Sequence, residues 1–351
     1  MIISRTPLRM SFVGGGSDMP SHYRKYGGAV LSTTIQKYVY IGINRKFDDG
    51  VRVAYSKTEE VASVDEIEHP LFRATLELLG IKGGIEVVTV ADIPSRGTGL
   101  GSSSAFTVGL INVVSAYQGR YISAQQMAAQ SCEIEIDICG APIGKQDQYA
   151  SAFGGLNLIE FHPDDSVSVS PIVMPRPALQ ELESRIITFY TGAERSASAL
   201  LQVAASVAAD DRQQASLQRM VKLAYQLRKD LQSGDISGFG EILDENWQLK
   251  RALAPGISSG QIDAWYDQAK AAGAVGGKVL GAGGGGFLMF YAPVSAHAAI
   301  ETALAPLRRV RFGLEPAGSR VIFHDPQDAG DAPPAFGSPA TPLMAPIGGA
   351  R

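Results

Sequence analysis

The chain has 351 residues, of which 45% are hydrophobic and 19% charged, and its formal net charge is −4. This length predicts two domains or one large one, and the slight acidity argues against nucleic-acid binding, which needs a basic surplus to neutralise phosphates. No apolar run approaches the roughly 18 residues of a membrane span, and the N-terminus lacks the pattern of a secretory signal. Its two cysteines, Cys132 and Cys139, are too few for a disulfide framework. We therefore expect a cytoplasmic protein with no nucleic-acid partner and no membrane partner.

Glycine is in clear excess, and its 39 copies are bunched between the predicted elements. In the first half of the chain, apolar and β-branched patterns predict strands at 4–13, 39–47 and 85–90. The loop at 14–18, Gly-Gly-Gly-Ser-Asp, breaks the chain after the first strand. A helix is predicted at 102–117, where apolar residues recur at helical spacing.

A second helix is predicted to begin at Ser123, which fits a capping box with Gln126. Its later part, 133–138, alternates Glu-Ile-Glu-Ile-Asp-Ile in the manner of a strand. We predict helix there as well, because no turn signal separates it from the Ala- and Gln-rich segment before it. Cys132 and Cys139 are then expected to pack in the core on one helical face.

After about residue 171 the pattern becomes mainly helical. Helical spacing predicts a long helix within 196–232 and further helices at 236–249 and 260–272. Strands at 278–280 and 287–291 are expected to form a hairpin closed by the glycine run between them. We place a domain boundary near 165–185, and expect a first domain at 1–175, a second at 176–325 and a disordered, Pro-rich tail at 326–351.

The strongest local motif is Pro94-Ser-Arg-Gly-Thr-Gly-Leu-Gly-Ser-Ser-Ser104, directly before a predicted helix. Its glycines let the backbone bend tightly and come close to a ligand. The free N–H groups at the start of the helix favour a phosphate, and serine hydroxyls can contact phosphate or Mg²⁺. The alternative is a plain Ser- and Gly-rich turn, which the length of the motif and the helix after it disfavour.

Two common nucleotide-binding motifs are excluded by their context. Gly281-Ala-Gly-Gly-Gly-Gly286 matches G-x-G-x-x-G, but it leads into a strand, whereas the dinucleotide motif opens a helix. Gly140-Ala-Pro-Ile-Gly-Lys145 has the wrong spacing for a P-loop and no Ser or Thr after the lysine. The glycine run at 281–286 is thus either a ligand loop or a tight hairpin.

Two clusters carry candidate catalytic groups. Asp147, close to Lys145 in a Gly- and Pro-bounded loop, suits removal of a proton from a hydroxyl. The carboxylates of 133–137 suit a metal ion, although such acids also occur on solvated helix faces. Asp18 suits hydrogen bonding to sugar hydroxyls and Arg9 suits a phosphate, although an Asp after glycine also commonly caps a turn.

Taken in chain order, the loops at 14–18, 94–104 and 281–286 resemble those of the GHMP small-molecule kinases. The resemblance extends over about residues 1–325. The resemblance implies an α+β fold of two domains. The N-terminal one would be a ribosomal-protein-like domain with a left-handed β-α-β unit, and the C-terminal one a ferredoxin-like α+β domain. It also implies ATP and Mg²⁺ as cofactors, with ATP and a sugar in the cleft between the domains.

Two segments, TPLRMSFVGGGSDMPSHYRKYGG at 6–28 and APIGKQDQYASAFGGLN at 141–157, resemble the sugar-kinase branch, most closely the D-glycero-D-manno-heptose 7-phosphate kinases. This resemblance implies ATP-dependent phosphorylation of the anomeric (C1) hydroxyl, giving heptose 1,7-bisphosphate and ADP for bacterial surface polysaccharides. The alternatives are another sugar 1-kinase, acting on fucose or a hexose, and a non-catalytic sugar sensor. The implied partners are a sugar phosphate and ATP, and a homodimer is left open.

The resemblance also assigns roles to individual residues. Asp147 matches the general base, with Lys145 and Arg9 beside the transferred phosphate, and Ser103 and Glu135 match the Mg²⁺ ligands. The residues matching the triphosphate loop are Gly97, Gly99, Gly101, Ser102, Ser103 and Ser104. Those matching the sugar site are Gly14, Gly15, Gly16, Ser17, Asp18, Gly283 and Gly284. Galactokinase has an acid and a histidine in place of Gly15 and Gly16, which leaves space here for a larger or phosphorylated sugar. Candidate cations for a distal phosphate are Arg24, Lys25 and Arg195.

Overall fold

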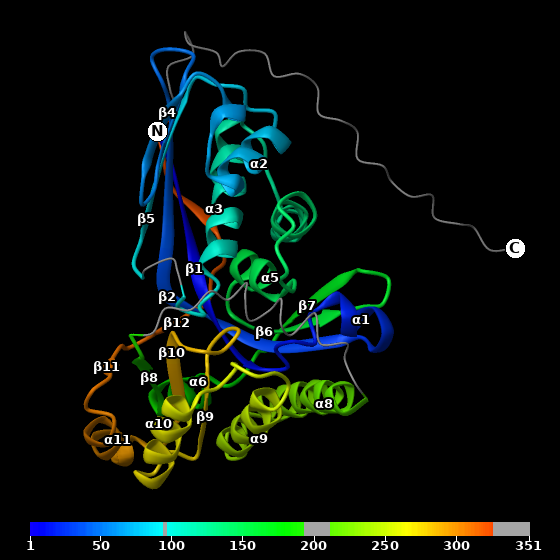
Figure 1. Cartoon of the computed structure of the whole chain (residues 1–351), viewed down its shortest axis with the longest axis vertical. Helices are drawn as coiled ribbons and strands as arrows, with labels where there is room; N and C mark the ends of the chain where they lie inside the picture. The colour runs from blue at the N-terminus through cyan, green and yellow to red at the C-terminus, as the bar shows by residue number, and fades with distance from the viewer. Residues whose placement is uncertain (94–96, 193–210, 326–351) are drawn as a thin grey trace, which may run out of the picture.

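The computed structural model describes residues 1–93, 97–192 and 211–325 (Figure 1). Two long antiparallel strands, β1 (Ile2–Val13) and β2 (Gly28–Arg45), form the centre of a nine-stranded sheet in this part of the chain. Further along, β2 pairs with β5 (Ile85–Ala91) through one half of its length and with β6 (Leu156–Phe161) through the other. The sheet is completed near its edges by β3 (Val51–Ala54), β4 (Thr58–Val61) and β7 (Val167–Pro171).

Helices cover one face of this sheet, as Figure 1 shows for α2 and α3. The central one, α3 (Ser102–Tyr117), is buried along most of its length, because its residues are almost all apolar or small. Against it pack α2 (Pro70–Leu78), α4 (Ala124–Cys132) and α5 (Gln146–Phe153). The predicted limits of α3 and the capping box of Ser123 and Gln126 are both confirmed.

The alternating segment Glu133–Ile138 continues α4 as a π-helix, so the prediction of helix over strand is confirmed. Its wider turn buries Ile134 and Glu135 side by side. Cys132 is buried and Cys139 is half-buried, and both pack in the same hydrophobic cluster, Cys139 at its edge, so the predicted core packing is confirmed.

The second sheet has the strand order β11-β8-β10-β9, with every neighbouring pair antiparallel. Its strands are β8 (Ile186–Tyr190), β9 (Gly276–Val279), β10 (Phe287–Tyr291) and β11 (Arg308–Arg309). The helices around it are α6 (Arg176–Arg185), α8 (Asp211–Ser233), α9 (Phe239–Arg251), α10 (Gly260–Ala271) and α11 (His297–Ala303). A βαββαβ succession with this order is the ferredoxin-like arrangement, and the predicted hairpin of β9 and β10 is part of it.

The last two strands return to the first sheet. There, β12 (Leu314–Glu315) pairs with β2, and β13 (Arg320–His324) pairs with β1. Residues 314–324 therefore complete the first sheet, although the predicted second domain extended over 176–325. The boundary between the domains stays a prediction, and part of the predicted long helix together with the predicted tail lies outside the described residues.

Near the start of the chain lies α1 (Pro20–Tyr26), and single 3-10 turns occur at Val64–Glu66 and Val294–Ala296. None of the helices in the described ranges combines the length and the apolar character needed to cross a bilayer.

Candidate active site

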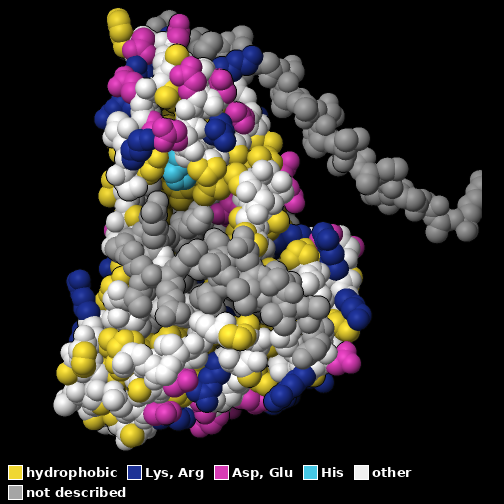
Figure 2. Space-filling model, in the orientation of Figure 1, with side chains coloured by type: hydrophobic (Ala, Val, Ile, Leu, Met, Phe, Trp, Pro, Cys, Tyr) yellow, Lys and Arg dark blue, Asp and Glu magenta, His cyan; other side chains and the backbone are white. Residues whose placement is uncertain are grey.

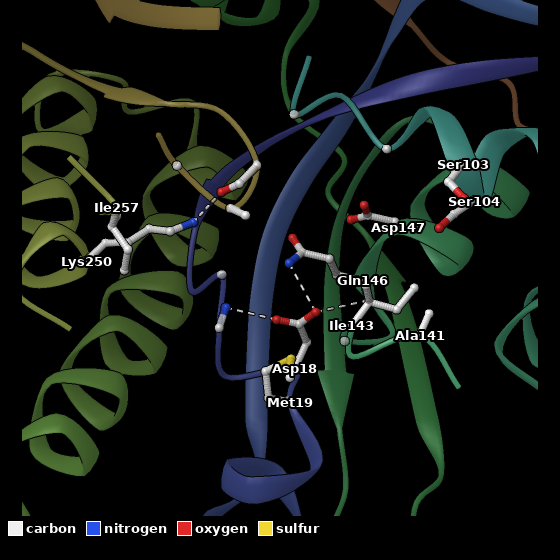
Figure 3. A pocket seen from close by; sticks show the side chains of 18 of the residues that line it. Asp18, Met19, Ser103, Ser104, Ala141, Ile143, Gln146, Asp147, Lys250 and Ile257 are labelled. Carbon is white, nitrogen blue, oxygen red and sulfur yellow. Dashed lines mark hydrogen bonds between the residues drawn. The ribbon is translucent and has the colours of Figure 1, made fainter. Parts of the chain in front are cut away.

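A cavity of about 750 Å³ opens between the two domains. The three glycine loops of the sequence analysis meet there, together with the N-terminus of α5 and parts of α8 and α9 (Figure 3).

The loop before α3 presents backbone N–H groups to the cavity. Gly97, Gly99 and Gly101 all have positive φ, between 70° and 74°, which only glycine adopts without strain. Gly101 is the residue before the first turn of α3, a turn whose N–H groups have no partner within the helix. The positive end of a 16-residue helix thus faces the cavity, which suits a bound phosphate.

Glu135 anchors the serines of this turn. Its carboxylate accepts hydrogen bonds from Ser103 Oγ (2.8 Å) and Ser104 Oγ (2.7 Å), and a third from Gln148 Nε2 (2.5 Å). Burial raises the pKa of Glu135 above its usual range, and the three hydrogen bonds partly oppose this shift. The donor set of one carboxylate and two hydroxyls is all oxygen, as Mg²⁺ prefers.

This donor set is small. No cluster of three or more His, Cys, Asp or Glu side chains suited to a metal occurs in the described part of the chain. A cation at Ser103 and Glu135 would therefore need other oxygens, such as those of a nucleotide, to complete its coordination.

Asp147, in the first turn of α5, forms a bidentate pair with Arg9 of β1. Arg9 Nε donates to Asp147 Oδ1 (2.7 Å) and Arg9 Nη2 to Oδ2 (2.6 Å). The third direction of the guanidinium is used as well, because Nη1 donates to Gly99 O (2.5 Å). Two parallel hydrogen bonds of this kind fix the guanidinium plane and the carboxylate plane relative to each other. Arg9 is buried while the Asp147 side chain stays 24% exposed, so its carboxylate is open to a ligand in the cavity.

Asp18 also lines the cavity. Its Oδ1 accepts from Gly16 N (2.9 Å), and its Oδ2 accepts from Gln146 N (3.3 Å) and Nε2 (3.1 Å), as Figure 3 shows. Burial raises the pKa of Asp18, while its backbone hydrogen bonds partly lower it. Gly144 packs so closely that a Cβ there would come within 2.0 Å of Asp18 Oδ2. There is thus no room for a side chain on Gly144 beside this carboxylate.

The second and third glycine loops touch backbone to backbone. A Cβ on Gly99 would lie 2.3 Å from Leu280 O, and one on Gly281 would lie 2.4 Å from Gly99 Cα. A Cβ on Gly286 would lie 2.5 Å from Thr98 O. The glycine run at 281–286 thus closes a hairpin and also supports the loop before α3 across the domain interface.

The structure brings most of the predicted site residues to the cavity. Those that line it are Arg9, Gly15, Gly16, Asp18, Gly97, Gly99, Gly101, Ser102, Ser103, Ser104, Glu135, Asp147 and Gly283. Gly14, Ser17 and Gly284 lie behind the lining and hold its loops, since Ser17 Oγ donates to Ala29 O (3.2 Å) and Gly284 N to Ile257 O (2.9 Å).

Lys145, predicted beside the transferred phosphate, is not among the residues that line the cavity. Its Nζ contacts Asp165 O (3.2 Å) and Oδ1 (3.4 Å) and lies over the Tyr23 ring, so its charge is directed to the β6–β7 turn rather than to Asp147. Of the three candidate cations for a distal phosphate, Arg24 pairs with Asp165, Lys25 lines the cavity and Arg195 lies outside the described residues.

Two residues that sequence reasoning missed are Gln146, which holds Asp18, and Lys250, which lines the cavity from α9. Gln146 directly precedes Asp147 in a loop that the sequence already identified as a candidate site, and this position is a signal that could have found it. Lys250 had no such signal, because it is the next-to-last residue of an ordinary amphipathic helix.

Comparison with known proteins decides the family. The model of the GHMP kinase N-terminal domain matches residues 68–155, and that of the C-terminal domain matches residues 227–306. The chain belongs to the GHMP kinases. As a GHMP kinase it is an ATP-dependent enzyme that transfers phosphate to a hydroxyl, and its two-domain fold is that of the family.

Three relatives illustrate the range of similar GHMP kinases. A D-glycero-alpha-D-manno-heptose 7-phosphate kinase of Campylobacter jejuni is 27% identical, over 83% of this chain and 89% of its own. A bifunctional fucokinase/GDP-fucose pyrophosphorylase of Arabidopsis thaliana is also 27% identical, over 82% of this chain and 29% of its own. The crystal structure of a D-glycero-D-manno-heptose 1-phosphate kinase from Bacteroides thetaiotaomicron has a TM-score of 0.76 and 26% identity, covering 93% of this chain and all of its own.

Proposed function

We propose that this GHMP kinase phosphorylates the anomeric hydroxyl of D-glycero-D-manno-heptose 7-phosphate with ATP, giving heptose 1,7-bisphosphate and ADP. The observation that carries the proposal is the Asp147–Arg9 pair, which stands between the N-terminus of α3 and the buried Asp18 in one cavity. A helix end suited to phosphate, a candidate proton acceptor and a candidate sugar-binding acid thus line the same cavity. Similarity to two kinases named for phosphates of manno-heptose supports the choice of sugar. The product would serve bacterial surface polysaccharide synthesis in the cytoplasm.

The reaction depends mainly on alignment and charge, because phosphoryl transfer needs little covalent help from the protein. In this proposal the triphosphate lies on the N–H groups of residues 101–104 at the start of α3. Asp147 accepts the proton of the attacking hydroxyl, and such general-base help is worth roughly 10²–10⁴-fold in rate. Arg9 holds the Asp147 carboxylate in one orientation through its two hydrogen bonds.

Ser103 and Glu135 would hold Mg²⁺, which when bound offsets the charge of the β- and γ-phosphates. Gln148 keeps the Glu135 carboxylate in place by donating to Oε2. Both serine hydroxyls donate to this carboxylate, so the three side chains lie together.

A second candidate is a kinase for an unphosphorylated sugar such as L-fucose, which the similarity to the fucokinase relative favours. A non-catalytic sugar sensor is the remaining alternative. It is disfavoured because a sensor has no need of the Asp147–Arg9 pair together with the Ser103–Glu135 contact.

The test is ADP release from ATP and Mg²⁺ with heptose 7-phosphate, mannose, fucose, galactose or no sugar. We expect turnover with heptose 7-phosphate at a kcat/KM at least 100-fold above that with any unphosphorylated sugar. Higher turnover with fucose or a hexose would replace the proposed substrate. Absence of turnover with every sugar, in a protein that binds ATP, would favour the sensor.

A further inference from the structure

Two lysines line the cavity in the described part of the chain, and they differ in burial. Lys25, near the end of the short helix α1, is exposed and its ammonium lies over the Tyr26 ring (4.9 Å). Lys250 of α9 is only 8% exposed, and its Nζ donates to Gly281 O (2.6 Å). An ammonium has three donor hydrogens, so Lys250 keeps two for the cavity.

Gly15 borders the space in front of Lys250. A Cβ on this glycine would lie 3.5 Å from Lys250 Nζ, 3.5 Å from Ser11 Oγ and 3.7 Å from Gln146 Nε2. Ser11 is 4% exposed, and its Oγ has no hydrogen-bond partner. A buried hydroxyl without a partner is costly, and here it borders the same space as a buried ammonium.

The order of the side chains across the cavity indicates which part of a bound sugar would lie in this space. In Figure 3, Ser103 and Ser104 lie at one end, Asp147 follows, Asp18 and Gln146 come next, and Lys250 lies at the other end. A sugar with its reacting hydroxyl at Asp147 and further hydroxyls at Asp18 would direct its far end toward Lys250. Arg9 is not available to that end, because it donates in three directions to Asp147 and Gly99.

We infer that Lys250, with Ser11 and the space left by Gly15, binds a phosphate that the sugar already carries at the end opposite its reacting hydroxyl. This inference rests on the proposed function and deepens it, since it assigns the group that selects phosphorylated over unphosphorylated sugars. A phosphate oxygen accepts from both an ammonium and a hydroxyl, so it satisfies the free donors of Lys250 and the hydroxyl of Ser11 together.

The experiment compares heptose 7-phosphate with the same heptose lacking the phosphate, and mannose 6-phosphate with mannose, in wild-type enzyme and variants. For Lys250→Met we expect the KM for the phosphorylated sugar to rise about 10- to 100-fold, as for loss of a charge-assisted hydrogen bond. The kcat at saturation should stay within about threefold. The ratio of kcat/KM between phosphorylated and unphosphorylated sugar should collapse, and Lys250→Arg should restore most of it.

Lys222→Met, an exposed lysine on α8, is the matched control and should leave this ratio unchanged. Lys25→Met tests the rival lysine at the mouth of the cavity. A collapse of the ratio in Lys25→Met but not in Lys250→Met would overturn the inference. So would a fall in kcat without a change in KM, which would place Lys250 on the transferred phosphate.

Equilibrium binding of heptose 7-phosphate without ATP gives a readout independent of turnover, and its Kd should rise by the same factor in Lys250→Met. If wild-type enzyme uses the phosphorylated heptose but the variant keeps its preference, this inference alone fails. If wild-type enzyme prefers unphosphorylated sugars, the proposed substrate fails and the inference with it.

Discussion

Replacing Asp147 with Asn tests the centre of the proposed mechanism, because it removes a charge while keeping the shape. The amide cannot accept the proton, so kcat should fall at least about 100-fold. The structure adds a second effect. Asn keeps one oxygen for Arg9 Nε but turns an NH₂ toward Arg9 Nη2, so two donors face each other around a side chain that is only 4% exposed.

The loss of a buried partner costs about 3 kcal/mol of folding free energy, at the lower end of the usual range because Asp147 itself is partly exposed. Saturating single-turnover kinetics would measure the chemical step, and urea unfolding would measure the stability. Asp267→Asn, at an exposed residue of α10 that does not line the cavity, makes the same change of charge and is the control for both. ATP affinity should stay within threefold. A fall in kcat of less than tenfold would rule out Asp147 as the base, and unchanged stability would refute the structural role given to the pair.

Three other predictions address the remaining parts of the site. Gly144→Ala places a methyl group 2.0 Å from the present position of Asp18 Oδ2, so the carboxylate must move and the KM for the sugar should rise at least tenfold while ATP affinity is kept. An unchanged KM for the sugar would refute the role given to Asp18. Glu135→Gln should raise the Mg²⁺ concentration needed for half-maximal rate at least tenfold, seen in a metal titration at fixed ATP. The pKa of Lys250 is lowered to about 8, mainly by burial, with Asp18 and Asp147 raising it and Arg9 lowering it. Its ammonium is therefore lost as the pH rises through 8, so kcat/KM for the sugar phosphate should fall above pH 8, and Lys250→Arg should move this fall to higher pH.

The parts of the molecule that the sequence predicts well are those with local causes. The start of α4 follows from Ser123 and Gln126, which satisfy each other within one turn. The loop before α3 can be predicted because its turns need positive φ, which each glycine adopts without strain. The matched positions of Arg9 and Asp147 came from family resemblance, and their direct contact is visible only in the structure.

Long-range contacts account for what was missed. Lys250 reaches the cavity because α9 packs beside the glycine run at 281–286, a contact that no local pattern encodes. Lys145 stands in a loop whose sequence suggests a catalytic lysine, yet its ammonium contacts Asp165 and lies over the Tyr23 ring. The strand β13 is short and mostly exposed, so its sequence does not indicate with which strand it pairs.

The return of β12 and β13 to the first sheet has a consequence for synthesis of the protein. These strands are made after the whole second sheet, yet they pair with the two strands that are made first. Until they leave the ribosome, the outer edge of β1 has unpaired N–H and C=O groups, which is a surface open to wrong pairing with other chains. The first domain can thus complete its sheet only when synthesis has passed residue 324, so its folding and that of the second domain are joined in time as well as in space.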